Sequence, residues 1–210
     1  MKAYLFLLVF IGLSSNLVLG QSFQKMADSK AFQKKLHEVT KNTKSLQTDF
    51  VQIKHLDVLS EDIESTGKLY YKANNLRWEY LAPLEYLIVL KDGKVSIKDE
   101  GKVSSYDLSG NKTFQKINEM MMSSIQGDVL VAEEDYTYVF KESSQSYLVE
   151  MYPKAKKVKE FMKSIKIYFS KKDYAVEQVK MMEQSGDYTL MKFKNKKLNA
   201  SISDQLFIIK

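Results

Sequence analysis

Few side chains in this sequence combine the types and spacing that catalysis requires. The two histidines, His37 and His55, occur in neither a His-x-x-x-His nor a Glu-x-x-His spacing, which argues against metal ligation. The chain has no cysteine, so thiol nucleophiles and thiolate metal sites are excluded. It also has no Gly-x-Ser-x-Gly elbow and no Gly-rich phosphate loop. The acidic run 133–135 precedes an alternating segment and is typical of a solvated turn. We therefore expect no catalytic residue, no metal site, no cofactor and no enzymatic activity.

The chemistry that remains is the binding of apolar surface by large aromatic side chains. Leu76, Trp78 and Tyr80 alternate with Arg77 and Glu79, so the two sets point to opposite faces of a strand. The same period of two places other large rings on one face, namely those of Tyr71, Tyr86, Tyr136 and Tyr138. Rings of this size do not fit a narrow closed barrel, but they line broad apolar surfaces with their hydroxyls at the rim.

The elements that carry these rings are predicted to be short antiparallel strands. Period-two patterns begin near Leu46, and the pair Asp92-Gly93 between two alternating runs is typical of a hairpin turn. The segments 171–173 and 185–187 predict further turns. About ten strands with almost no helix between them indicate an antiparallel meander in a mainly β domain.

Two helices are predicted beside this sheet. Phe32, Leu36, Val39, Thr43 and Leu46 recur at helical spacing, and Asp28 or Ser29 can cap the start. The segment 113–125 forms a second apolar stripe that contains three consecutive methionines. Methionine adapts to irregular apolar partners, so this segment is either gap-filling core or a lid.

A sheet of this size tends to curl, and a sheet that curls only halfway needs a cover on its concave face. The sequence supplies two amphipathic helices and no second sheet. We therefore predict a curled, unclosed antiparallel half-barrel with a concave apolar cavity that is covered by the N-terminal helix and the Met-rich helix. The cavity is expected to be lined by Phe50, Leu69, Tyr71, Trp78, Tyr80, Ile88, Leu90, Ile117, Met120, Met121 and Ile125.

The N-terminal segment predicts export from the cytoplasm. Lys2 is followed by an apolar run over residues 3–13, which is too short to span a bilayer. Residues 1–20 are thus interpreted as a signal peptide cleaved before Gln21, with an uncleaved anchor as the alternative, and residues 21–210 as a single domain. The net charge of +6 is scattered, and no basic run belongs to a nucleic-acid motif, so we expect no nucleic-acid partner.

Four ordered motifs resemble the LolA family of periplasmic outer-membrane lipoprotein carriers. They are the segment 45–52 with Phe50 and Gln52, the segment 67–72 that begins Gly-Lys-Leu, the aromatic-Trp strand 76–80, and Pro83 followed by a strand that ends Asp92-Gly93-Lys94. The segment from Tyr152 to about Phe207 is similar to the C-terminal half of that family more loosely.

This resemblance implies a monomeric periplasmic chaperone that needs no cofactor. Such a protein binds lipoprotein acyl chains and carries them from an inner-membrane release complex to an outer-membrane acceptor. By the same resemblance Trp78 and Tyr80 line the cavity, and Ile117, Met120 and Met121 face it from the lid. The sequence departs from the family pattern at two places. Ala73 stands where well-studied members have a lid-holding Arg, and we expect the extra C-terminal loop and strand of some members, which are linked to one-way transfer, to be missing.

The sequence leaves two other functions open. One is a periplasmic sensor or adaptor of the same fold that binds a protein partner. The other is a carrier for a different lipid, such as a glycolipid or a pigment precursor.

Overall fold

The computed structural model describes residues 22–107 and 134–209, and within them the chain forms one antiparallel sheet of twelve strands. The strand order is β1-β8-β9-β10-β11-β12-β2-β3-β4-β5-β6-β7. The strands are β1 (Gln24–Lys25), β2 (Ser45–His55), β3 (Ile63–Lys72), β4 (Asn75–Ala82), β5 (Tyr86–Lys91), β6 (Lys94–Asp99), β7 (Lys102–Asp107), β8 (Tyr136–Glu142), β9 (Ser146–Pro153), β10 (Met162–Ser170), β11 (Val176–Glu183) and β12 (Tyr188–Leu198). The described helices are α1 (Ser29–Lys41), α3 (Lys156–Lys159) and the 3-10 turn η2 (Asp204–Phe207).

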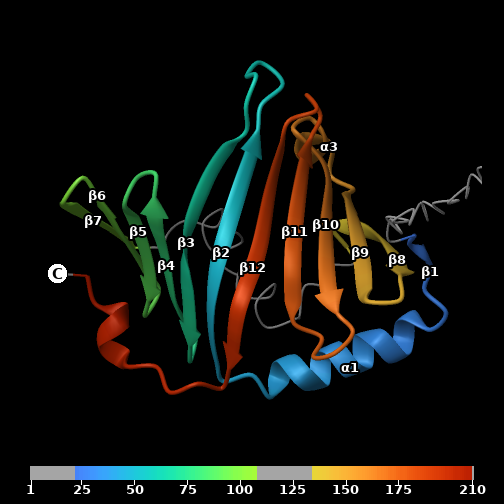
Figure 1. The fold of residues 1–210 in the computed structure, drawn as a ribbon, viewed down its shortest axis with the longest axis horizontal. Coiled ribbons are helices and arrows are strands. Elements are labelled where there is room, and N and C mark those ends of the chain that lie inside the picture. The colour runs from blue at the N-terminus through green and yellow to red at the C-terminus, as the bar shows by residue number, and fades with distance from the viewer. Residues whose placement is uncertain (1–21, 108–133, 210) are drawn as a thin grey trace, which may run out of the picture.

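The sheet is curled but open. Its two edges bend back to the same side of the central strands β12 and β2 (Figure 1). The edge strands β1 and β7 stand at opposite ends of the strand order and do not pair with each other. The predicted fold class, an unclosed antiparallel half-barrel, is therefore confirmed, with two strands more than the ten expected.

The tight turns follow the predicted chemistry. Asp92 and Gly93 connect β5 to β6 with φ values of +50° and +73°, the pair of positive angles that a type I′ hairpin requires. Gly186 takes φ +105° in the β11–β12 turn, where the segment 185–187 was expected to reverse the chain. The turn predicted over 171–173 connects β10 to β11.

The helix α1 crosses the lower end of the sheet in Figure 1. The Asp28 side chain caps it by accepting a hydrogen bond from the Ala31 amide at 2.9 Å. Its buried residues Phe32 and Leu36 pack in one cluster with Val149, Ile167 and Phe169 of the sheet. The predicted amphipathic helix and its cap are therefore present.

The predicted C-terminal extension of this helix is wrong. The helix ends at Lys41, and Leu46 lies in β2 rather than on the helical stripe. The Asn42 side chain donates to the Glu38 carbonyl at the helix end. The Lys44 amide donates to the Asn199 side chain at 2.8 Å instead of to a helix carbonyl, so the chain enters β2 at Ser45 and Leu46 cannot continue the helix.

The C-terminal segment covers part of the outer, convex face of the sheet, over β4 and β5. Ile202 and Phe207 pack against Val89 of β5. The Arg77 Nη1 donates to the Leu206 carbonyl at 3.0 Å, and its Nη2 pairs with Glu79 at 2.7 Å. Arg77 thus faces away from Trp78 as the alternation predicted, and in this structure it holds the C-terminal segment.

Several predictions lie outside the described residues. These are the signal peptide, its cleavage site and the helix 113–125 with Ile117, Met120, Met121 and Ile125. Among the helices in the described ranges, none has the length and apolar character that crossing a membrane demands.

Candidate functional site

The concave face carries a continuous apolar surface because antiparallel pairing aligns the inward residues of neighbouring strands. Across the middle of the sheet, Thr48 pairs with Leu69, Leu69 with Trp78, and Trp78 with Ile88. All seven predicted cavity residues that lie in the described part of the chain fall in one cluster. These are Phe50, Leu69, Tyr71, Trp78, Tyr80, Ile88 and Leu90.

These residues form two layers that differ in exposure. Phe50 and Leu69 are only 1% and 2% exposed, and Tyr71 and Leu90 are also buried. They form the floor of the surface. Trp78, Tyr80 and Ile88 are half-buried, so their apolar groups remain accessible on the concave side. An incoming apolar ligand would contact this second layer first.

The aromatic rings of this surface pack against one another. The Phe50 ring centroid lies 5.4 Å from that of Trp78 and 5.1 Å from that of Tyr80, in tilted and edge-on arrangements. Tyr80 and Tyr86 continue the row with centroids 6.2 Å apart. Rings that support one another in this way present a firm surface, which lowers the entropic cost of binding a flexible ligand.

The glycine at position 67 makes the packing of Phe50 possible. Gly67 pairs with Phe50 on β2 and with Tyr80 on β4, next to a register shift in the β3–β4 ladder. A Cβ at this position would overlap the Glu79 carbonyl oxygen and the Phe50 ring. The absence of a side chain lets the ring lie against the β3 backbone.

Two polar groups interrupt the apolar surface. The Tyr80 hydroxyl donates to the Gln52 Oε1 at 2.9 Å. Burial raises the pKa of this tyrosine, and the neighbouring Trp78 indole opposes that rise. The indole Nε1 is itself buried and has no hydrogen-bond partner among the residues that the structure describes. A buried N–H without an acceptor is rare and costly, which marks this position as unusual.

A second apolar cluster lies on the same face under α1. Val179 of β11 packs against both clusters, which shows that they share one face of the sheet. Helix α1 contributes Phe32 and Leu36 to its own cluster and no residue to the cluster around Trp78. The concave face is therefore divided into a half that α1 covers and a half that α1 leaves accessible.

His55 joins two neighbouring turns of the fold through its contacts. Its Nδ1 lies 2.7 Å from the Asp62 carboxylate and its Nε2 3.2 Å from that of Asp57. These contacts, led by the Asp62 hydrogen bond and opposed by desolvation, raise the pKa of His55. The ring stacks on Tyr188 at 4.8 Å, and the Asp57 amide donates to Asp187. The cluster ties the β2–β3 hairpin to the β11–β12 turn.

No group of three potential metal ligands is assembled within residues 22–107 and 134–209. An open pocket of about 340 Å³ lies beside the C-terminal segment and includes Lys44 and Lys72. The Lys72 ammonium is already bonded to the Ile202 carbonyl and to Asp204, both at 2.7 Å. That lysine therefore serves to hold the C-terminal segment on the sheet.

Sequence reasoning missed part of the surface. Met191 and Phe193 of β12 and Val95 of β6 belong to the Trp78 cluster, whereas alternation identifies them only as strand residues. Gln52 was also missed as a polar member, although its alternation with Phe50 places it on the concave side. The missing information was the position of β12 beside β2, a pairing that is distant in sequence.

Comparisons with known proteins agree with this architecture. The sequence matches the family model for the outer membrane lipoprotein carrier protein LolA over residues 41–210. No curated protein sequence matches the chain.

The solved structures that resemble this chain are distant from it in sequence. An uncharacterised conserved protein from Thermus thermophilus has a TM-score of 0.57 at 11% identity, covering 86% of this chain and 95% of that one. A chain of the Pseudomonas aeruginosa MucA/MucB complex has a TM-score of 0.52 at 12% identity, covering 86% of this chain and 60% of that one. A LolA superfamily protein from Nitrosomonas europaea has a TM-score of 0.43 at 11% identity, with 88% and 99% covered. The chain thus spans about three-fifths of the MucA/MucB chain, and likeness at such identities concerns the fold alone.

Proposed function

This chain belongs to the LolA family of outer membrane lipoprotein carriers, and we propose that it binds the acyl chains of lipoproteins on its concave aromatic face. In this proposal it carries them through the periplasm from the inner to the outer membrane. The observation that carries the proposal is the row of half-buried apolar side chains, Trp78, Tyr80 and Ile88, over a fully buried floor.

The energetics suit a carrier. Each buried methylene contributes about 0.8 kcal/mol, so an acyl chain of roughly fifteen methylenes is worth on the order of 12 kcal/mol when it leaves water. A concave surface that is open on one side buries only part of an acyl chain, which suits a carrier that has to bind its cargo and then release it. Methionines 120 and 121, with Ile117 and Ile125, remain our predicted lid for the other side of the acyl chain.

The remaining features of the proposal rest on the N-terminal sequence and on the family resemblance. Residues 1–20 act as a signal peptide that is removed on export, and residues 21–210 form the carrier domain. The protein works as a monomer without a metal or cofactor, and it performs no chemical reaction. Its partners are lipoproteins, an inner-membrane release complex and an outer-membrane acceptor.

Native mass spectrometry tests the cargo directly. The protein is co-expressed with a lipidated periplasmic protein, and in parallel with a version of that cargo whose lipidated Cys is replaced by Ser. A complex with the lipidated form alone supports acyl-chain recognition. Equal binding to both forms, or binding to neither, contradicts it.

A pair of charge substitutions tests the site. Ile88→Asp places a carboxylate on the concave face, whereas Val103→Asp places one on the outer face of β7, opposite Lys98, where the valine is 47% exposed. An unpaired charge that faces an acyl chain costs on the order of 2–3 kcal/mol, so Ile88→Asp should weaken binding of lipidated cargo by roughly 30- to 100-fold. Val103→Asp should bind as the parent does. Equal effects of the two substitutions would place the acyl site elsewhere.

A second candidate function is the binding of a partner protein. The fold is shared with a chain of the MucA/MucB complex, in which two proteins associate. Co-purification of a protein partner that survives removal of its lipid would favour this function over lipoprotein transport.

A further inference from the structure

A lysine-rich segment joins β9 to β10. Residues 154–163, which include the first two residues of β10, contain five lysines and one glutamate, with the helix α3 in the middle. The side chains of Lys156, Lys157, Lys159 and Lys163 are exposed. We call these four lysines, together with Phe161, the α3 corner.

The backbone of the α3 corner is fixed although its side chains are free to project. The Gln184 amide donates to the Phe161 carbonyl at 3.1 Å, and the Gln184 side chain donates to the Lys159 carbonyl at 2.9 Å. At the other end of the connection, the Lys154 amide donates to the Asp135 carbonyl at 2.8 Å. The corner is thus a defined surface of the fold rather than a loose loop.

The lysines of the α3 corner differ from the lysines that the fold uses. Elsewhere Lys54, Lys72, Lys141, Lys166 and Lys171 all form ion pairs with carboxylates. Within the described ranges, none of the four corner lysines forms an ion pair. Their charges are consequently available to an external anionic surface.

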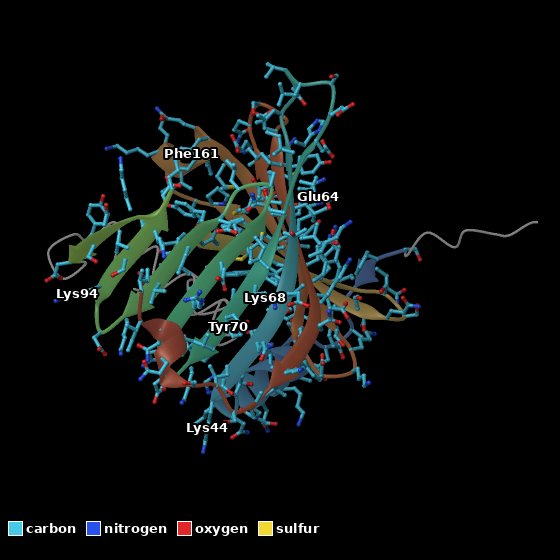
Figure 2. All side chains as sticks on the ribbon, turned by 60° about the vertical axis from the view of Figure 1, so that its left-hand side comes forward. Lys44, Glu64, Lys68, Tyr70, Lys94 and Phe161 are labelled. Atoms are coloured by element: carbon cyan, nitrogen blue, oxygen red, sulfur yellow. The ribbon has the colours of Figure 1, made fainter. Side chains whose placement is uncertain are left out.

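An exposed aromatic ring lies among these charges. Phe161 is 59% exposed and lies at the opposite end of the sheet from Lys44, in a group of nitrogen-tipped side chains (Figure 2). A ring flanked by lysines matches the composition of interfacial membrane contacts, in which the ring enters the headgroup boundary and the ammonium groups bind lipid phosphates.

The residue types suit an anionic lipid surface. The α3 corner has lysines only, on flexible stems that act as point charges. Such groups adapt to a fluid array of phosphates.

We propose that the α3 corner docks on anionic phospholipid membranes. This docking is independent of the acyl-chain site, because none of its residues belongs to the Trp78 cluster. The neighbouring β2–β3 hairpin bears Asp57, Glu61, Asp62 and Glu64, so we expect an anionic bilayer to approach the corner from the side away from that hairpin. A lysine near an anionic surface strengthens binding by about fivefold, so four produce a salt-sensitive and reversible attachment.

Vesicle sedimentation tests the proposal. The protein is mixed with vesicles of phosphatidylglycerol and phosphatidylcholine, and separately with pure phosphatidylcholine, at low and high salt. We expect binding to the anionic vesicles only, and loss of that binding at high salt. The triple variant Lys156→Gln, Lys157→Gln, Lys159→Gln should bind about 100-fold more weakly, and Phe161→Ser should weaken binding further.

A control with the same change in net charge separates local docking from general attraction. Lys44, Lys194 and Lys197 are also exposed and unpaired among the described residues, and their triple Gln variant removes three charges elsewhere. This variant should keep most of the vesicle binding. Equal losses in the two triple variants, or parental binding by the corner variant, would overturn the proposal. All variants have the same N-terminal segment, so any vesicle binding by that segment is the same in each, and differences between variants report on the corner.

Discussion

The substitution Gly67→Ala should destabilise the protein far more than an added methyl group usually does. A Cβ at this position would overlap the Glu79 carbonyl oxygen, which is backbone and cannot rotate away. It would also overlap the Phe50 ring, whose Cε1 would be 2.7 Å away. Relief therefore requires the β3 and β4 backbones to separate by on the order of 1 Å.

The expected cost has two parts. Overpacking of a filled core costs about 1–3 kcal/mol. Separation of the strands also weakens ladder hydrogen bonds beside Gly67, each worth about 1 kcal/mol. We therefore expect the free energy of unfolding to fall by about 3–4 kcal/mol, which corresponds to a decrease of roughly 10 °C in Tm for a chain of this size.

Urea unfolding measures this effect with an internal probe. Trp78 is the single tryptophan of the chain, and its ring centroid lies 5.4 Å from that of Phe50, so its fluorescence reports on the packing at Gly67. Gly93→Ala serves as the control, because Gly93 has φ +73° but no atom within 4 Å of an added Cβ. Backbone strain alone should then cost about 1–2 kcal/mol.

A double variant separates the two overlaps. Phe50→Ala removes the ring, so Gly67→Ala should lower the free energy of unfolding by less in that background than in the parent. The loss should still exceed that caused by Gly93→Ala, because the overlap with the Glu79 carbonyl remains. If Gly67→Ala is no more destabilising than Gly93→Ala, the close packing of Phe50 against β3 is refuted.

Two further predictions concern pH. Because the carboxylates around His55 raise its pKa in the folded state, the stability it contributes is complete below its ordinary value of 6.5 and is lost as pH rises through the folded-state pKa. Urea midpoints should therefore fall as pH rises above 6.5, and His55→Gln should flatten this dependence; an unchanged pH profile in the variant would contradict it. On the outer face, burial opposes ionisation of Glu150, but hydrogen bonds from Lys141 at 2.8 Å and Lys166 at 3.1 Å lower its pKa below 4.5. The stability that Glu150 contributes is present above pH 4.5 and is lost as pH falls through its folded-state pKa. Glu150→Gln should therefore lower the free energy of unfolding by about 1–2 kcal/mol at neutral pH and by less in acid. A loss of the same size at all pH values would exclude the ion pairs as its cause.

The part of the fold that the sequence predicts is the part set by local alternation. The opposed placement of Trp78 and Arg77 and the Asp92-Gly93 hairpin both depend on residues close together in the chain, and the structure has them as expected. The prediction that the helix includes Thr43 and Leu46 is wrong because a helical and a strand pattern of apolar residues overlap there. Hydrogen bonds to Asn199, far along the sequence, decide between the two patterns.

Long-range contacts explain what the sequence did not predict. Glu150 occupies an alternating strand position and is 4% exposed, and only the spatial approach of two lysines makes its burial acceptable. The packing of Phe207 on the outer face depends likewise on Arg77 and Val89, which are distant in sequence. For the candidate site, alternation grouped the inward residues of β2–β5 correctly, but it could not add Met191 and Phe193 from β12.

The division of the concave face has a consequence for how the domain opens. Phe32 and Leu36 of α1 bury one cluster, whereas the cluster around Trp78 receives no side chain from that helix. Backbone amides of β9 and β10 should therefore exchange with solvent deuterium only on global unfolding, while those of β4 and β5 exchange through smaller local openings. Cargo that binds at Trp78 would slow exchange in β4 and β5 selectively, so the occupied and empty protein would differ in their pattern of protection as well as in their overall stability.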